Sequence, residues 1–300
     1  MKHILAFSLL IALSLSPAVR AENSAITADP PRDTAFPPAM DAFQISTHGK
    51  LVNALAYLAA GPGPHPTVVL LHGFPGNERN LDLAQAIRRA GWNVLYFNYR
   101  GAWGSPGDFS FAHCIEDAEA TLAWLRQPVN AARLRTDPAR LVLVGHSMGG
   151  FVALETTAHD PAVKAVITIS AADMSEALAR DVPKSDKERW LAVTAARLEA
   201  EGLAPLARTS AKTLAAELAA NAERWRFATL TPGLANRQVL AITSDDGLTL
   251  EVADLIARLR TARNTQAREI HIATDHAYSD RRIALTEAVL AELDRLGKQP

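Results

Sequence analysis

Five residues from Gly145 to Gly149 read Gly-His-Ser-Met-Gly, the spacing of a turn that presents a serine nucleophile. An apolar run at 141–144 precedes them, and a helix-like run follows. A strand-to-helix turn this tight leaves no room for bulk beside the serine, which explains the flanking glycines. The backbone N–H of Met148 would lie at the helix N-terminus and could donate to an oxyanion. We therefore predict Ser147 as an acyl-transfer nucleophile.

A serine hydroxyl is a weak nucleophile at neutral pH, so it needs a base within hydrogen-bond reach. Among nine histidines, His276 is the best placed, because it follows an expected strand at 268–273 in a loop. Open α/β sheets bind their ligands at such carboxyl ends of strands. His271 lies inside that strand, where we expect it to pack, and His159 suits a cation near a helix end. We predict His276 as the base.

The base needs an acid to orient it, and three aspartates compete for that role. Asp246 follows an expected strand at 238–243 by enough residues to reach the next loop, and Gly247 allows a turn after it. Asp245 could fill the same role or cap the turn instead. Asp275 is next to His276, and neighbouring residues rarely orient each other well. We predict Asp246, with Asp245 as the main alternative.

The elements around these residues alternate between short apolar strands and helices. Strands are expected at 42–47, 51–59, 67–72, 94–98, 141–146, 164–169, 238–243 and 268–273. Helices are expected at 79–90, 113–126, 148–158, 248–262 and 280–296. Such alternation predicts an α/β fold with a mostly parallel eight-stranded sheet and helices on both faces. The first two strands, separated by a turn at His48-Gly49, are expected to form an antiparallel hairpin at one edge.

Residues 173–236 interrupt this alternation with a helical, strand-free segment, which predicts a helical lid insertion. Ser185 to Glu188 has the pattern of a capping box for its first long helix. Gly202 and Pro205 should end that helix, and Thr231-Pro232-Gly233 should end the last one. The segment holds nine basic and nine acidic residues, so it gives no indication of an ionic substrate. Trp190 and Trp225 are expected to pack within the insertion or to line a substrate wall.

The N-terminal segment has the features of a signal peptide. Residues 1–21 combine a short basic start, an apolar stretch at 4–15 and small or apolar residues before a cleavage point. Residues 22–40 are expected to be a flexible lead-in, and 41–300 to form the folded domain. The sole cysteine, Cys114, excludes an internal disulfide. We predict export to the periplasm of a bacterium or secretion, with no stable membrane insertion once the signal is removed.

Composition excludes several classes of function. The net charge of −1 gives no reason to expect a nucleic-acid partner, and a hydrophobic fraction of 48% supplies a large core. Neither a dinucleotide-binding glycine motif nor a Walker motif is present. His72 and His146 have no second metal ligand at a suitable spacing. We expect neither a cofactor nor a metal, and the oligomeric state stays open.

Taken together, these motifs resemble the α/β-hydrolase superfamily, in the branch of serine aminopeptidase-like and dienelactone-hydrolase-like esterases and lipases. The resemblance covers about 41–296. The residues that carry it are His72 to Gly76, Tyr99 to Ser105, Gly145 to Gly150, Asp246-Gly247 and Asp275-His276. It implies the order serine, acid, histidine along the chain, and an oxyanion-hole N–H from the loop after the strand at 67–72. That residue would be Phe74, since Pro75 has no N–H.

The resemblance implies a serine hydrolase. Cleavage of a carboxylic ester is the first hypothesis, and cleavage of an amide or short peptide is the second. A binding protein without activity is the alternative of another class. The expected partner is a small ester or short peptide. Nearby, Arg100 could bind a substrate carboxylate or tie loops together, and Trp103 could line the acyl pocket or pack in its loop.

Overall fold

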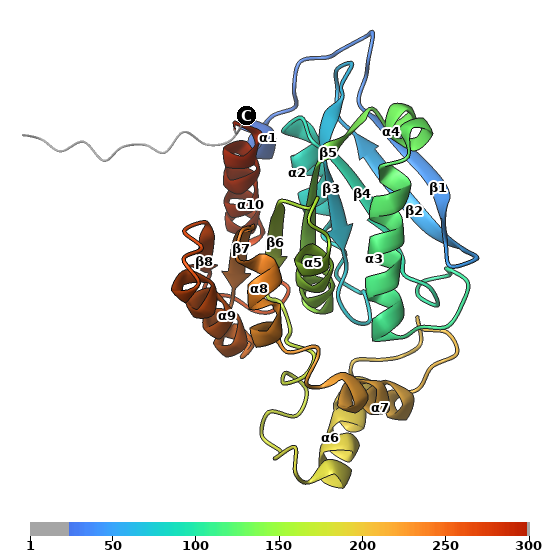
Figure 1. The fold of residues 1–300 in the computed structure, drawn as a ribbon. Coiled ribbons are helices and arrows are strands. Elements are labelled where there is room, and N and C mark those ends of the chain that lie inside the picture. Colours follow the sequence, from blue (N-terminus) through green and yellow to red (C-terminus); the bar gives the residue numbers. More distant parts are fainter. Residues whose placement is uncertain (1–23, 299–300) are drawn as a thin grey trace, which may run out of the picture.

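The computed structural model describes residues 24–298, so the predicted signal peptide lies outside the described residues. One eight-stranded sheet, with strand order β1-β2-β4-β3-β5-β6-β7-β8, runs through the molecule (Figure 1). Its strands are β1 (Ala39–Thr47), β2 (Lys50–Leu58), β3 (His65–Leu71), β4 (Asn93–Phe97), β5 (Thr136–His146), β6 (Ala165–Ile169), β7 (Gln238–Thr243) and β8 (Ala267–His271). Strand β2 is antiparallel to both of its neighbours, β1 and β4, and every other neighbouring pair is parallel. The predicted mostly parallel sheet with an edge hairpin is confirmed.

Helices cover both faces of this sheet. They are α1 (Ser24–Thr27), α2 (Leu81–Arg89), α3 (Phe111–Leu125), α4 (Pro128–Leu134), α5 (Met148–His159), α6 (Lys187–Ala200), α7 (Ala211–Asn221), the 3₁₀ helix η1 (Phe227–Leu230), α8 (Thr231–Leu234), α9 (Thr249–Thr261) and α10 (Arg282–Gly297). Helices α2 and α10 pack on one face, and α3, α5 and α9 pack on the other. Each face therefore has its own apolar core.

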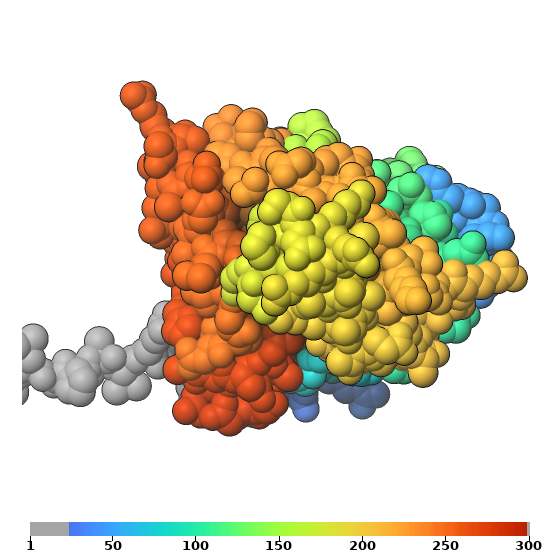
Figure 2. All heavy atoms as spheres, turned by 90° about the horizontal axis from the view of Figure 1, so that it is seen from below, coloured from blue at the N-terminus to red at the C-terminus, as the bar shows by residue number. Residues whose placement is uncertain are grey.

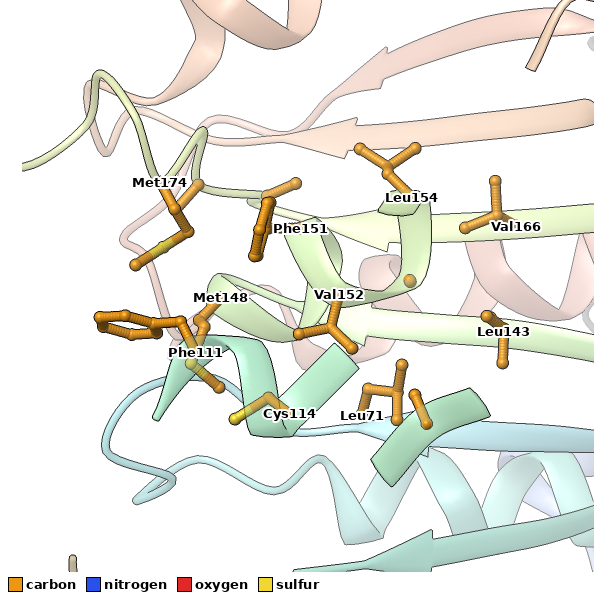
Figure 3. Close-up of a cluster of buried hydrophobic side chains, with 14 of the residues drawn as sticks. Leu71, Phe111, Cys114, Leu143, Met148, Phe151, Val152, Leu154, Val166 and Met174 are labelled. Atoms are coloured by element: carbon orange, nitrogen blue, oxygen red, sulfur yellow. The ribbon is translucent and has the colours of Figure 1, made fainter. Parts of the chain in front are cut away.

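Along each central strand, successive side chains point to opposite faces of the sheet, and both faces are buried. These strands are therefore apolar throughout. In β3, Val68 and Leu70 belong to the core under α2 and α10, whereas Val69 and Leu71 belong to the core under α3 and α5. A strand buried on both faces has no position left for a polar side chain. Figure 3 shows the second of these cores, where Leu71 of β3 lies beside residues of α3 and α5. These central strands therefore hold the loops at their carboxyl ends in place.

Residues 173–236 connect β6 to β7 and form α6, α7, η1 and α8. The carboxyl ends of the parallel strands point toward this insertion (Figure 1), and it occupies the middle of that face in Figure 2. A single β-bridge, Ala102 to Leu206, and the hydrogen bond from the Trp103 N–H to the Pro205 carbonyl join it to the loop after β4. The Glu217 carboxylate accepts from the first N–H groups of α3, at 2.8 and 3.0 Å.

Both tryptophans of the insertion pack in the apolar core. Trp190 is 4% exposed and Trp225 is 1% exposed. The Trp225 ring lies edge-on to Phe151 of α5, with 5.4 Å between ring centroids. Trp225 therefore packs the insertion against α5, the helix that follows Ser147. Truncating such a buried aromatic residue to alanine costs about 3–5 kcal/mol of stability.

Some local predictions were wrong. The N-cap of α6 is Asp186, whose side chain accepts from the Arg189 N–H, rather than Ser185. Thr231, Pro232 and Gly233 form most of the short helix α8 instead of ending a helix. Helix α4 was missed because only seven residues form it. The short helix α1 lies in the segment that was expected to be a flexible lead-in. Within residues 24–298, no helix combines the length and the apolar character that crossing a bilayer requires.

Candidate active site

Ser147 lies at the turn between β5 and α5, in a strained backbone conformation. Its φ of 58° is in the left-handed region, which a non-glycine residue adopts only when its surroundings impose it. A Cβ on Gly145 would run into the Gly149 carbonyl, and a Cβ on Gly149 would run into the Leu71 carbonyl. The glycines therefore allow β5, α5 and β3 to approach closely enough to hold the serine in this turn.

The serine backbone is tied to the neighbouring strand. Its N–H donates to the Ile169 carbonyl of β6 at 2.9 Å, and its carbonyl accepts from the Ala172 N–H at 3.1 Å. Met148 is the first residue of α5, and the first N–H groups of a helix have no acceptor within the helix. The Met148 side chain packs in the apolar core, and the residue is 1% exposed. The predicted donor Met148 thus lies at a helix N-terminus beside Ser147.

The loop with the second predicted donor, Phe74, packs against Ser147. A Cβ on Gly73 would be 2.9 Å from the Ser147 Cβ and 3.5 Å from its Oγ. The His72 Nδ1–H donates to the Gly73 carbonyl at 2.8 Å. Carbonyl and N–H point in opposite directions across a trans peptide, so this bond also orients the Phe74 N–H. Burial lowers the pKa of His72 to about 4, which keeps its ring neutral.

Asp246 and His276, from the loops after β7 and β8, form a hydrogen bond. His276 Nδ1 is 2.7 Å from the Asp246 Oδ2. The second oxygen of Asp246 accepts from the Leu248 N–H at 2.9 Å. Burial of Asp246 opposes its ionisation, but the hydrogen bonds from His276 and Leu248 outweigh burial and lower the pKa of Asp246 to about 2. The carboxylate is ionised at neutral pH, and its bond to Nδ1 leaves Nε2 of His276 as the basic nitrogen.

His146 links this pair to the serine turn. Its Nε2 is 2.9 Å from the His276 carbonyl oxygen, and the two imidazole rings are 4.7 Å apart. Among the described residues, no side chain forms a hydrogen bond with the Ser147 hydroxyl. The structure therefore brings together the loops of Ser147, Asp246 and His276, without a hydrogen bond between the Ser147 hydroxyl and the His276 ring.

The other two aspartates have different partners. Asp245 lies 3.1 Å from Nε2 of His271, and its side chain is 64% exposed. The Asp275 carboxylate accepts from the Ser279 N–H at 2.8 Å and so closes its own turn. His271 is the last residue of β8 rather than an interior one, its side chain is 44% exposed, and its Nδ1 is 3.1 Å from the Thr243 hydroxyl. Of the three aspartates, only Asp246 forms a hydrogen bond with the His276 ring.

Arg100 and Trp103 hold loops rather than facing open space. The Arg100 guanidinium binds the carboxylates of Asp117, at 2.6 Å, and Glu116. These bonds tie the loop after β4 to α3, the second of the two roles expected from the sequence. The Trp103 Nε1–H donates to the Pro75 carbonyl at 2.7 Å and so braces the loop that carries Phe74.

Three features of the site are not visible in the sequence. The first is the bond between His146 and the His276 carbonyl. The second is a buried hydroxyl cluster beside Asp246, in which Ser170 contacts Ser244 at 2.8 Å and Tyr278 at 3.1 Å. The third is the Glu217 bond to α3. Each joins residues far apart in the chain, so only the tertiary structure reveals it. Within residues 24–298, no group of three or more His, Cys, Asp or Glu side chains could hold a metal ion.

The fold and this arrangement define the class of protein. A profile described as the alpha/beta hydrolase fold matches residues 66–244, and the chain belongs to that family. The chain is 30% identical over 175 residues to the sn-1-specific diacylglycerol lipase ABHD11 of Xenopus tropicalis, with 57% of this chain and 50% of the relative covered. It is 28% identical over 139 residues to an uncharacterised protein of Mycobacterium tuberculosis, with 46% and 48% covered. The chain thus spans about half the length of these curated relatives.

Solved structures of esterases share the fold. The structure of Est1E from Butyrivibrio proteoclasticus with bound ferulic acid superposes with a TM-score of 0.63, at 16% identity, and covers 86% of this chain and 100% of that one. The thermostable carboxylesterase EstE1, cloned from a metagenomic library, gives a TM-score of 0.60 at 19% identity, with 88% and 91% covered. At these identities the likeness concerns the fold alone. They agree with the family match on the alpha/beta hydrolase fold.

Proposed function

We propose that the protein is a serine hydrolase that cleaves carboxylic esters through an acyl-enzyme on Ser147. The observation that carries the proposal is the 2.7 Å bond between Asp246 and His276, at the same edge of the sheet as the strained turn of Ser147. The names of the similar proteins, a diacylglycerol lipase and a carboxylesterase, favour an ester as the substrate. Neither name specifies which acyl or alcohol group this chain would accept.

The proposed reaction begins with attack of the Ser147 Oγ on the ester carbonyl carbon, while Nε2 of His276 takes the hydroxyl proton. The N–H groups of Phe74 and Met148 stabilise the resulting oxyanion. The carbon–oxygen bond to the alcohol then breaks, and His276 returns its proton to the leaving oxygen. Water, activated by the same nitrogen, releases the acid from Ser147. Asp246 stays ionised throughout and keeps the histidine in the tautomer with its proton on Nδ1.

This proposal can be tested on the full chain with a fluorophosphonate probe and a panel of nitrophenyl esters of different chain lengths. We expect the probe to label the wild-type protein, and Ser147→Ala to abolish labelling and reduce ester hydrolysis by on the order of 10³-fold or more. Aminoacyl-nitroanilides serve as the amide arm of the same panel. Near-wild-type hydrolysis by Ser147→Ala would exclude this mechanism, and a wild-type protein that neither labels nor hydrolyses would indicate a binding protein.

We further propose that the helical insertion shields the acyl-enzyme from bulk water. Its position at the carboxyl end of the sheet supports this role, as does its attachment to α3 through Glu217. We expect Glu217→Ala to loosen the insertion, so that a protease cleaves within 173–236 faster and the KM for esters rises. Glu199→Ala, an exposed change on α6, is the matched control. Equal proteolysis and equal KM in the two variants would contradict the shielding role.

In line with the predicted signal peptide, we propose that the enzyme acts in the periplasm or after secretion. Expression of the full chain in a bacterial host, followed by fractionation and N-terminal sequencing, tests this. We expect a mature protein that starts near residue 22, outside the cytoplasm. Recovery of unprocessed protein from the cytoplasmic fraction alone would contradict export.

A further inference from the structure

His146, the residue directly before Ser147, is in contact with both the backbone and the ring of His276. Its side chain is buried, with 4% of the residue exposed. Its Nε2 lies 2.9 Å from the His276 carbonyl oxygen, and its ring lies 4.7 Å from the His276 ring, tilted by 37°. The two residues are 130 positions apart in the chain. Among the described residues, no other side-chain hydrogen bond joins the serine turn to the loop of His276.

The protonation of His146 follows from this contact. A carbonyl oxygen can only accept, so the Nε2 of His146 carries a hydrogen and donates it. Burial, and next the neighbouring His276, lower the pKa of His146 to about 3, so the ring is neutral in the working range of the site. A neutral imidazole has one N–H, which leaves Nδ1 as a bare acceptor. That Nδ1 is buried and has no partner among the described residues.

Such a ring is costly to bury. An unsatisfied buried acceptor costs about 1–3 kcal/mol, and an apolar side chain of similar shape would avoid that cost. The favourable polar contact that the structure gives His146 is the bond to the His276 carbonyl. Burying the His146 ring therefore costs stability, and the residue that this ring contacts is the proposed base.

We propose that His146 is a positioning residue for His276, an inference that rests on the proposed function. His276 itself is then held at two points. Asp246 holds the imidazole from the loop after β7, and His146 holds the backbone carbonyl from the end of β5. The second point sets the distance between the base and Ser147, because His146 and Ser147 are adjacent in one rigid turn. Asp246 by itself fixes the direction of the imidazole without fixing that distance.

The neutral state of His146 matters for the same reason. When His276 takes the serine proton, its ring becomes a cation 4.7 Å from the His146 ring. A second cation at that distance would oppose the proton transfer, whereas a neutral ring does not. Besides His276, the charged groups that act on the His146 ring are the Arg282 guanidinium and the Asp246 carboxylate. Burial of His146 therefore keeps a positive charge away from the base.

Three substitutions separate the donor from the ring. His146→Gln places an amide N–H near the position of Nε2, His146→Asn places one near the position of Nδ1, and His146→Phe keeps an aromatic ring without a donor. The measurements on the full chain are kcat and KM for a nitrophenyl ester, the rate of fluorophosphonate labelling and the melting temperature. Glutamine and asparagine are matched in polarity, so they are the control for each other.

We expect His146→Phe and His146→Asn to lower kcat and the labelling rate by about 30- to 100-fold, the effect of a small displacement of a catalytic group. KM should stay within about threefold, since His146 contacts the base rather than the open site. His146→Gln should restore kcat to within about fivefold of the wild type. If His146 were merely structural, its substitution would change the melting temperature, and kcat would not differ between His146→Gln and His146→Asn.

The outcomes separate this inference from the proposed function. If the wild type labels at Ser147 and requires His276, yet folded His146→Phe keeps the wild-type kcat, the positioning role is wrong. Equal kcat in His146→Gln and His146→Asn refutes it as well, even if His146→Phe fails to fold. If the wild type does not label, or hydrolysis survives in Ser147→Ala, the proposed function itself fails.

Discussion

Two aspartate–histidine pairs lie side by side at the carboxyl edge of the sheet, and they differ in almost everything except residue type. Asp246 and His276 are 2.7 Å apart, and the Asp246 side chain is 5% exposed. Asp245 and His271 are 3.1 Å apart, and the Asp245 side chain is 64% exposed. The two aspartates are neighbours in the chain, so one residue step moves a carboxylate from a buried site to the solvent.

The difference shows what makes a carboxylate useful to a base. Besides His276, Asp246 accepts hydrogen bonds from the Leu248 N–H and the Ser170 side chain. All of these bonds favour the ionised form of the carboxylate. A solvent-exposed pair such as Asp245 and His271 is screened by water, and exposed ion pairs contribute about 0–1 kcal/mol. Burial strengthens each interaction of Asp246 and restrains the direction in which His276 points.

The largest expected effect separates the two histidines. His276→Ala should reduce ester hydrolysis by on the order of 10⁴-fold, because the serine loses its base. His271→Ala should leave kcat within about threefold, since His271 faces Asp245 and solvent. The measurement is kcat/KM for both variants, at protein concentrations confirmed by circular dichroism. A large loss in His271→Ala would mean that the exposed pair takes part in the reaction.

The aspartates should differ next. Asp246→Asn should lower kcat by on the order of 10³-fold or more, because an amide favours the wrong tautomer of His276. Asp245→Asn should change kcat by less than about threefold. The same nitrophenyl ester assay compares the two variants. Reversed effects would show that the exposed aspartate is the acid and that the hydrogen bond seen here is not the one used in catalysis.

The pH dependence of stability should separate the aspartates as well. The pKa of Asp246 is about 2 in the folded protein and 3.8 as its ordinary value, so the folded state stabilises the ionised form. This contribution, on the order of 2 kcal/mol, is fully present above pH 4 and is lost as the pH falls toward 2. Urea unfolding from pH 6 to pH 2.5 should therefore show a smaller loss of stability in Asp246→Asn than in the wild type. Asp245→Asn should follow the wild type, and a parallel response of all three proteins would contradict the assignment.

The smallest expected effect concerns the hydroxyl cluster under the buried pair. Tyr278 is fully buried, and its hydroxyl donates to the Ile242 carbonyl at 3.2 Å. Tyr278→Phe should cost about 1–2 kcal/mol of stability, since it removes the buried hydrogen bonds to the Ile242 carbonyl and the Ser170 hydroxyl, and should lower kcat only a few-fold. Tyr57→Phe, on β2 far from the pair, is the control in the same urea unfolding experiment. A loss of activity as large as that of Asp246→Asn would place Tyr278 in the reaction itself.

Much of the fold follows from local signals that a sequence contains. The strands β3, β6 and β7 and the second half of β5 are apolar runs, and the glycines around Ser147 mark the turn after β5, so these positions were predicted within a few residues. The start of β5 at Thr136, before the predicted 141, was missed because most of its first residues are polar. Helix α4 was missed because seven residues give too little periodicity. The two roles considered for the tryptophans of the insertion could not be separated from the sequence, since Trp225, for example, packs on Phe151, which lies elsewhere in the chain.

By itself, the sequence determined the class of fold, the serine turn and a short set of candidates for base and acid. These depend on spacing along the chain, such as glycines beside a serine or an aspartate just past a strand. Only the tertiary structure decided which aspartate meets His276, and that His146 holds the His276 carbonyl. Side-chain contacts between loops depend on strand register, loop direction and burial, and a shift of one residue exchanges the buried Asp246 for the exposed Asp245.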